Sequence, residues 1–170
     1  MSGRVWLAAG LIIIASSGAS GCHHHSLSDT VVPSASQDSL AGVVSVTGTS
    51  FEQHLVLRLD GSTRELAASR GDSSALSRLG GAEVVVFGAA GASRFAVTAF
   101  TVKSVGGAAV VDGTLRRDGT RFSLHTRKAI LVLGNPPAAF DSLVGARIWI
   151  GGPLDSGPNV YGVIVSPSPR

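Results

Sequence analysis

The chain has 170 residues, of which 44% are hydrophobic and only 15% are charged, so it is not a highly charged, disordered chain. Its formal net charge is +3, and one of the positive charges, Arg4, belongs to the N-terminal leader, so the mature part gives little reason to expect nucleic-acid binding. The 22 glycines and the many β-branched residues favour short strands joined by turns over long helices.

The first 22 residues have the pattern of an export signal. Arg4 supplies a positive charge, and the apolar run 5–15 is too short to span a bilayer, which needs about 20 residues. Small residues fill positions 16–21, directly before Cys22, the single cysteine of the chain. The stretch Ala19-Ser20-Gly21-Cys22 resembles the lipobox of bacterial lipoproteins, which most often carry Leu where Ala19 stands.

This resemblance implies that residues 1–21 are a signal peptide and that Cys22 becomes a lipidated N-terminus bearing palmitate-like acyl chains. Each buried CH₂ contributes about 0.8 kcal/mol, so several chains anchor a protein firmly to a membrane. We therefore expect a bacterial cell-envelope protein. His23 stands in place of the Asp that retains some lipoproteins at the inner membrane, which favours the outer membrane by analogy. An ordinary secreted protein and an uncleaved anchor are the alternatives.

Residues 22–40 are predicted to be the lipidated cysteine and a flexible tether. The segment is rich in serine, contains one proline and has no sustained hydrophobic period. His23, His24 and His25 carry imidazoles, which can bind transition metals. Because nothing in such a tether shapes a coordination sphere, we expect neither a metal site nor a cofactor.

Residues 41–105 predict one folded unit of five strands and a helix. Leu55, Leu57 and Leu59 alternate with polar positions, Asp60-Gly61 predicts a hairpin turn, and Asp72-Ser73-Ser74 offers an N-cap. The predicted elements are strands at 43–46, 54–59 and 62–67, a helix ending at 79, and strands at 84–87 and 95–102.

Residues 106–166 repeat this order, followed by a loose tail at 167–170. The stretch 79–88 recurs as 143–152, and in both copies Leu precedes a Gly-Ala step, a β-branched strand and glycine. Asp118-Gly119 predicts a hairpin turn, and Asn135-Pro136-Pro137 ends a strand and can open a helix. The predicted elements are strands at 109–115, 121–126 and 129–133, a helix at 138–144, and strands at 148–150 and 161–165.

The order strand, strand, strand, helix, strand, strand resembles the oligonucleotide/oligosaccharide-binding (OB) fold. The resemblance implies a mainly β protein with two tandem small five-stranded OB-like β-barrels, each with a short helix between strands 3 and 4. Closing such sheets would also remove exposed strand edges. One continuous β-sandwich, or a single larger barrel that shares strands from both halves, is the alternative architecture.

Barrels of this family bind ligands on strands two and three and in neighbouring loops. The second unit has a basic cluster there, and a nearby tryptophan adds a stacking surface. The candidate ligand-binding residues are Arg116, Arg117, Arg121, His125, Arg127, Lys128 and Trp149. Alternatively, the basic cluster is a solvated face that keeps the barrel soluble. Trp149 either stacks on a sugar or packs between the units, and the apolar Val85 and Phe87 at matching repeat positions favour packing.

No catalytic residue is expected. His54 and His125 fall in different units, and no Gly-x-Ser-x-Gly elbow or metal-ligand spacing accompanies them. We therefore predict a non-catalytic binding or scaffolding lipoprotein whose partners are the membrane and an envelope glycan, an anionic lipid or a protein, rather than nucleic acid. A purely structural envelope protein and a metal-handling protein that uses His23 to His25 are the alternatives.

Overall fold

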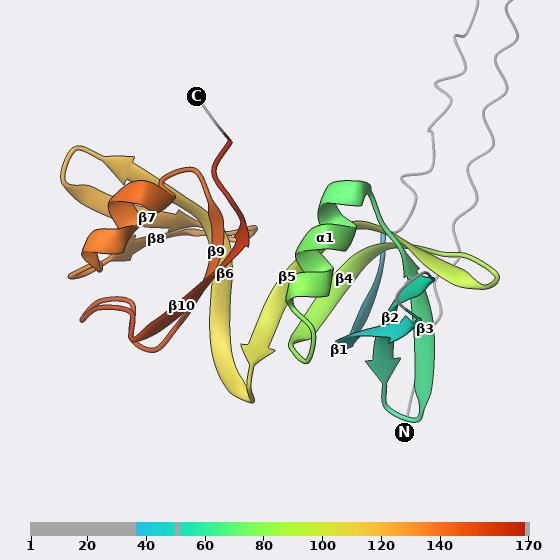
Figure 1. Cartoon of the computed structure of the whole chain (residues 1–170). Coiled ribbons are helices and arrows are strands. Elements are labelled where there is room, and N and C mark those ends of the chain that lie inside the picture. The colour runs from blue at the N-terminus through green and yellow to red at the C-terminus, as the bar shows by residue number, and fades with distance from the viewer. Residues whose placement is uncertain (1–36, 50–51, 169–170) are drawn as a thin grey trace, which may run out of the picture. The chain divides into compact units, whose positions relative to one another are not determined.

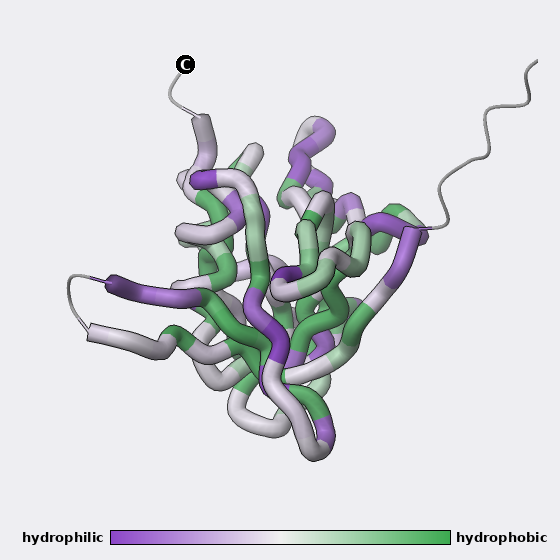
Figure 2. The backbone as a smooth tube through the Cα atoms, turned by 90° about the vertical axis from the view of Figure 1, so that its right-hand side faces the viewer, coloured by the Kyte–Doolittle hydropathy of each residue, from purple (hydrophilic) through white to green (hydrophobic). Residues whose placement is uncertain are grey.

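The computed structural model describes residues 37–49 and 52–168. Cys22, His23, His24, His25 and the predicted leader lie outside these residues. The described chain is mainly β, as predicted (Figure 1). Figure 2 shows hydrophobic and hydrophilic segments interspersed along the backbone. Within residues 83–88 burial alternates from one residue to the next, as expected for a strand with one face in a core.

The first strand set closes into a five-stranded β-barrel with a helix between its third and fourth strands. Around the barrel the strand order is β1-β2-β3-β5-β4 and back to β1, and only the β3–β5 pair is parallel. The elements are β1 Asp38–Gly48, β2 Gln53–Leu59, β3 Ser62–Ala67, α1 Arg70–Arg78, β4 Glu83–Ala90 and β5 Arg94–Val105. The first strand therefore begins inside the segment that we assigned to the tether.

Two glycines allow the strands of this barrel to approach closely. A Cβ at Gly42, where β1 passes from β4 to β2, would lie 2.4 Å from the carbonyl oxygen of Arg58. A Cβ at Gly88, beside a shift in the β4–β5 register, would lie 1.8 Å from the carbonyl oxygen of Ala96. No side chain fits at either position, so glycine is part of how the sheet closes.

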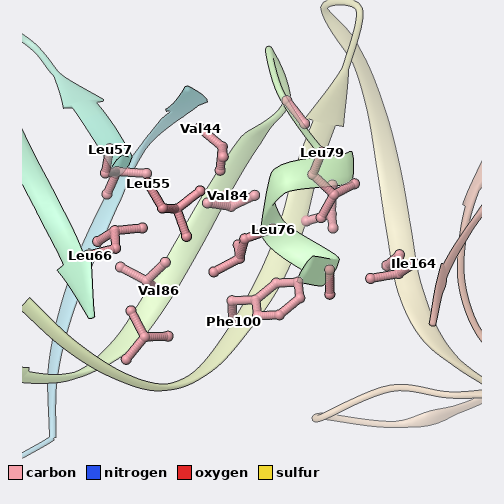
Figure 3. Packing of buried hydrophobic residues seen from close by; sticks show 14 of the residues in the cluster. Val44, Leu55, Leu57, Leu66, Leu76, Leu79, Val84, Val86, Phe100 and Ile164 are labelled. Carbon is pink, nitrogen blue, oxygen red and sulfur yellow. The ribbon is translucent and has the colours of Figure 1, made fainter. Parts of the chain in front are cut away.

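The alternation predicted for β2 directs Leu55 and Leu57 into the barrel core, whereas Arg58 is exposed. Helix α1 adds Ala75 and Leu76 to the same cluster, which Figure 3 shows from close by. The helix starts earlier than we predicted. Its N-cap is Ser69, whose hydroxyl accepts a hydrogen bond from the Asp72 amide at 3.2 Å and donates to the Asp72 carboxylate at 2.8 Å.

The second strand set has its own core but a different closure. The strand order is β10-β9-β6-β7-β8, and Phe140 lies in the core with its ring centroid 4.9 Å from that of Tyr161. The elements are β6 Ala108–Asp118, β7 Arg121–His125, β8 Ile130–Leu133, the 3₁₀ helix η1 Ala138–Leu143, β9 Arg147–Gly151 and β10 Val160–Val165.

The predicted second closed barrel is not formed by strand ladders within residues 106–168. Strand β8 pairs only with β7 there, and β10 pairs only with β9. The loop before β10 takes the place of a ladder, because the Gly134 amide donates to the Leu154 carbonyl at 2.8 Å. The apolar run of β8 also has only one buried side, since Ile130 is 64% and Val132 is 67% exposed.

The sequence repeat is nevertheless reproduced in the backbone. Gly81 and Gly145 both adopt positive φ, at +85° and +91°, directly after the helix of each set. Three equivalent backbone hydrogen bonds surround each glycine: Val44 N to Ala82 O, Gly81 N to Val44 O and Ala82 N to Leu79 O in the first set, and Leu115 N to Ala146 O, Gly145 N to Leu115 O and Ala146 N to Leu143 O in the second. The Gly-Ala step therefore docks the end of each helix onto the first strand of its set.

Candidate functional site

The predicted basic residues lie on both faces of the β6–β7 hairpin. Arg116 pairs with Ser123 and Asp118 pairs with Arg121 in the ladder. Because side chains alternate along each strand, Arg116, Arg121 and His125 share the face that points away from the core, and all three are exposed. Arg116 and Arg121 line none of the four hollows described for this part of the chain, whereas His125 lines one of them.

Arg117 has a structural task on the opposite face. Its guanidinium carbon lies 5.2 Å from the centre of the Phe122 ring, and its Nε donates to the Gly119 carbonyl at 2.8 Å. The guanidinium also forms an ion pair with Asp141 on η1. Arg117 therefore fastens η1 to the hairpin and is separated from the other predicted ligand-binding arginines.

The β7–β8 turn presents Arg127 and Lys128 in a defined position. The Thr126 hydroxyl accepts hydrogen bonds from the amides of Lys128 at 3.1 Å and Ala129 at 2.9 Å, and it donates to the Ala129 carbonyl at 2.8 Å. The Arg127 guanidinium stacks on the Phe87 ring of the barrel, 4.4 Å from its centre. These contacts hold the turn against the outer surface of β4.

A cleft with a volume of about 500 Å³ lies between this turn and the barrel wall. Its floor is mainly apolar and comes from β4, β5 and β6: Val85, Phe87, Val102, Val110 and Val111. Its polar lining consists of two threonines, three cations and one carboxylate: Thr101, Lys103, Asp112, Thr126, Arg127 and Lys128. We call this site the two-lysine cleft.

A smaller hollow of about 220 Å³ adjoins the two-lysine cleft. The two share Asp112, Thr126 and Arg127 in their linings, and the smaller one adds His125 and Arg147. Of the predicted ligand-binding residues, Arg127 lines both hollows, Lys128 lines the larger one and His125 the smaller one. Lys103 was not found by sequence reasoning, because it belongs to the first strand set and only the fold brings it to the β7–β8 turn.

A buried ion pair joins the two strand sets beneath this site. Asp112 on β6 is 8% exposed, and its Oδ2 accepts hydrogen bonds from Nε and Nη2 of Arg147 on β9 at 2.9 and 2.5 Å. Its Oδ1 accepts from the Val102 amide on β5 at 2.9 Å. Arg147 also donates to the Phe100 carbonyl at 2.6 Å and stacks on the Phe100 ring, 4.0 Å from its centre. We call this arrangement the Asp112 lock.

Trp149 lies on the inner side of the same junction. It is partly buried and packs against the core of the first strand set. Its indole covers Gly162, where a Cβ would lie 2.5 Å from the indole nitrogen. Ile164 on β10 is fully buried in the same first core, close to α1 (Figure 3). The packing role for Trp149 is thus the one that these contacts support.

A second charged group lies on the barrel wall away from the cleft. Nδ1 of His54 lies 3.0 Å from Oε1 of Glu65, and Nε of Arg94 lies 3.1 Å from the same oxygen. The hydrogen bond from His54, together with the charge and hydrogen bond of Arg94, lowers the pKa of Glu65, although partial burial opposes the shift. With its carboxylate held in this way, Glu65 acts as an anchor for two cross-strand neighbours.

The described residues contain no group of three or more His, Cys, Asp or Glu side chains that could hold a metal ion. In the same part of the chain, none of the helices is both long enough and apolar enough to cross a bilayer. Comparisons with protein-family models, with curated proteins and with solved structures find no match to this chain. The function is therefore inferred from the chain's own residues.

Proposed function

We propose that the chain is a lipid-anchored protein of a bacterial cell envelope that binds a partner without catalysing a reaction. The observation that carries this proposal is the lipobox-like stretch ending at Cys22, which precedes a folded β-structure with a basic cleft. Acyl chains on Cys22 would hold the protein at the membrane and raise the concentration of the cleft there. By the analogy drawn from His23, this membrane is the outer one.

We also propose that both strand sets are OB-like units. Support comes from their common element order, from the matching hydrogen bonds around Gly81 and Gly145, and from equivalent close approaches at Gly42 and Gly113. A Cβ at Gly113 would lie 2.6 Å from the His125 carbonyl oxygen, much as one at Gly42 would meet Arg58. In this interpretation the second unit replaces the β3–β5 ladder of the barrel with the loop that contacts Gly134.

The carboxylates of Asp112, which lines the cleft, and of Glu65, which lies away from it, support binding rather than catalysis. Asp112 is committed to Arg147 and to the Val102 amide, and Glu65 is committed to His54 and Arg94. A general base or nucleophile needs a reactive group that is free to meet substrate and is oriented by a neighbour. These two carboxylates instead serve as cross-strand ties.

Metabolic labelling with palmitate tests the anchor directly. We expect the wild-type chain to incorporate the label, to lose residues 1–21 and to fractionate with membranes. The Cys22→Ser variant should incorporate no label and should be released from the membrane fraction. Ser26→Ala, placed just after the expected acylation site, is the matched control and should behave as wild type.

Two results would contradict the proposal of lipidation. One is palmitate label that persists in Cys22→Ser, because the thiol would then not be the acylated group. The other is a wild-type N-terminal peptide whose mass shows an intact leader or an unmodified cysteine. Neither result depends on what the cleft binds.

A further inference from the structure

The chain contains two lysines, and both line the same cleft. Lys103 comes from β5 in the barrel wall, and Lys128 comes from the β7–β8 turn of the other strand set. Arg127 adds a third positive charge to the lining. Asp112 is the single carboxylate among the lining residues in the described chain, and its oxygens already accept hydrogen bonds from Arg147 and Val102. Three cations therefore face the cleft without a neutralising partner among its lining residues.

The floor between these cations is apolar. Val85 and Phe87 point outward from β4 and are half-buried, and Val111 on β6 is 36% exposed. Covering such side chains with an apolar group removes them from water, which favours binding. The volume of about 500 Å³ lies within the range of about 300–1,000 Å³ that is usual for small-molecule sites. A ligand that matches this lining has an anionic end and an apolar body.

We propose that the two-lysine cleft binds an anionic amphiphile, in which a carboxylate or phosphate is joined to a short apolar chain. Lys103 and Lys128 hold the anionic group, and the chain lies on Val85 and Val111 beside the Phe87 ring, one face of which Arg127 covers. The proposal rests on the proposed function as a non-catalytic binding protein and names its ligand class. A free fatty acid and an anionic phospholipid share this chemistry, and the experiment separates them.

The two lysines also provide the means of testing the proposal. Reductive methylation with ¹³C-formaldehyde keeps the positive charge and places a ¹³C-dimethyl group on Lys103 and Lys128. The purified full chain is labelled first and is then reconstituted into phosphatidylcholine nanodiscs. The two lysine signals are assigned with Lys103→Arg and Lys128→Arg, each of which removes one signal and retains the charge.

Three soluble probes are then compared by titration. We expect hexanoate to shift both lysine signals saturably. Hexyltrimethylammonium has the same chain with the opposite charge and should shift neither signal. Inorganic phosphate has the charge without the chain and should bind at least about tenfold more weakly than hexanoate, which corresponds to the loss of about 1.4 kcal/mol of chain contact. Nanodiscs that contain phosphatidylglycerol, without hexanoate, reproduce the shifts if the membrane itself supplies the ligand.

A matched pair of variants links the shifts to the cleft. Val111→Asp places a carboxylate on the floor and should weaken hexanoate binding on the order of tenfold, because the acid repels the probe and competes for the lysines. Val160→Asp makes the same change on β10, at a valine that is 56% exposed and does not line the cleft. It should leave the affinity unchanged, and a lysine spectrum like that of the wild type verifies that each variant is folded.

Equal shifts with hexyltrimethylammonium, equal affinity for phosphate and hexanoate, or equal weakening by the two aspartate variants would each overturn the proposal. The outcome is separate from that of the anchor. A labelled chain that does not associate with nanodiscs contradicts lipidation, while its lysine signals still report on the cleft in free solution. A lipidated chain whose signals do not respond to hexanoate or to phosphatidylglycerol contradicts the ligand assignment alone.

Discussion

Replacing Asp112 with alanine should weaken the connection between the two strand sets. The substitution removes the acceptor for two hydrogen bonds from Arg147 and one from the Val102 amide. Removing one partner of a buried ion pair typically costs about 3–5 kcal/mol, because the remaining charge is left uncompensated. The Arg147 side chain is 24% exposed and keeps its hydrogen bond to Phe100, so we expect a loss of about 2–3 kcal/mol.

Urea unfolding, monitored by circular dichroism, measures this loss of stability as a lower urea concentration at the midpoint with an unchanged m-value. Asp118→Ala is the matched control, since Asp118 lies on the same strand but is exposed at the hairpin end, and its effect should stay within about 0.5 kcal/mol. In a double-mutant cycle, Asp112→Ala combined with Arg147→Met should cost less than the sum of the single variants. A free energy of unfolding for Asp112→Ala within about 0.5 kcal/mol of the wild-type value would refute this role of Asp112.

Three further perturbations test particular contacts by the same unfolding assay. Gly88→Ala should lower the free energy of unfolding by about 3 kcal/mol or more, because its Cβ would meet a backbone oxygen at 1.8 Å. Gly80→Ala, whose Cβ would have its nearest contact at 3.6 Å, should be nearly neutral. Equal effects of the two substitutions would contradict the close strand packing at Gly88. Glu65→Gln should reduce the dependence of the free energy of unfolding on pH in the acid range. The lowered pKa of Glu65 stabilises the folded state above the unfolded pKa of 4.5, and this stabilisation is lost as the pH falls through the folded pKa. An unchanged pH dependence in the variant would argue against the ion pairs of Glu65. Ile164→Ala should cost about 2–5 kcal/mol and Val165→Ala, at a residue 44% exposed, less than about 0.5; similar losses would show that β10 does not enter the first core.

Much of the first strand set could be predicted because its signals are local. Alternating leucines mark the inner face of β2, and the turn at Asp60-Gly61 has the positive φ of +73° at the glycine. The Gly-Ala repeat likewise indicates a local backbone requirement, because Gly81 and Gly145 adopt positive φ in the two copies of the repeat. Such features depend on neighbouring residues and can therefore be recognised without the fold.

Features that depend on distant partners were not predictable. The N-cap falls on Ser69 because the chain leaves β3 there, although Asp72-Ser73-Ser74 has the same local chemistry. The second set closes through the contact between Gly134 and Leu154 rather than a ladder, and no hydrophobic period encodes that contact. Lys103 was overlooked for the same reason, since a single exposed lysine on a strand acquires meaning only when the β7–β8 turn lies opposite it.

A short amine-reactive cross-linker gives the most direct test that one cleft is assembled from both strand sets. Lys103 and Lys128 are the two lysines of the chain, so an intramolecular link between side chains has one possible pair. We expect dilute native protein to yield the Lys103–Lys128 cross-linked peptide by mass spectrometry, and urea-unfolded protein to yield far less of it. Native protein in which both lysines are modified but remain unlinked to each other would contradict the cleft.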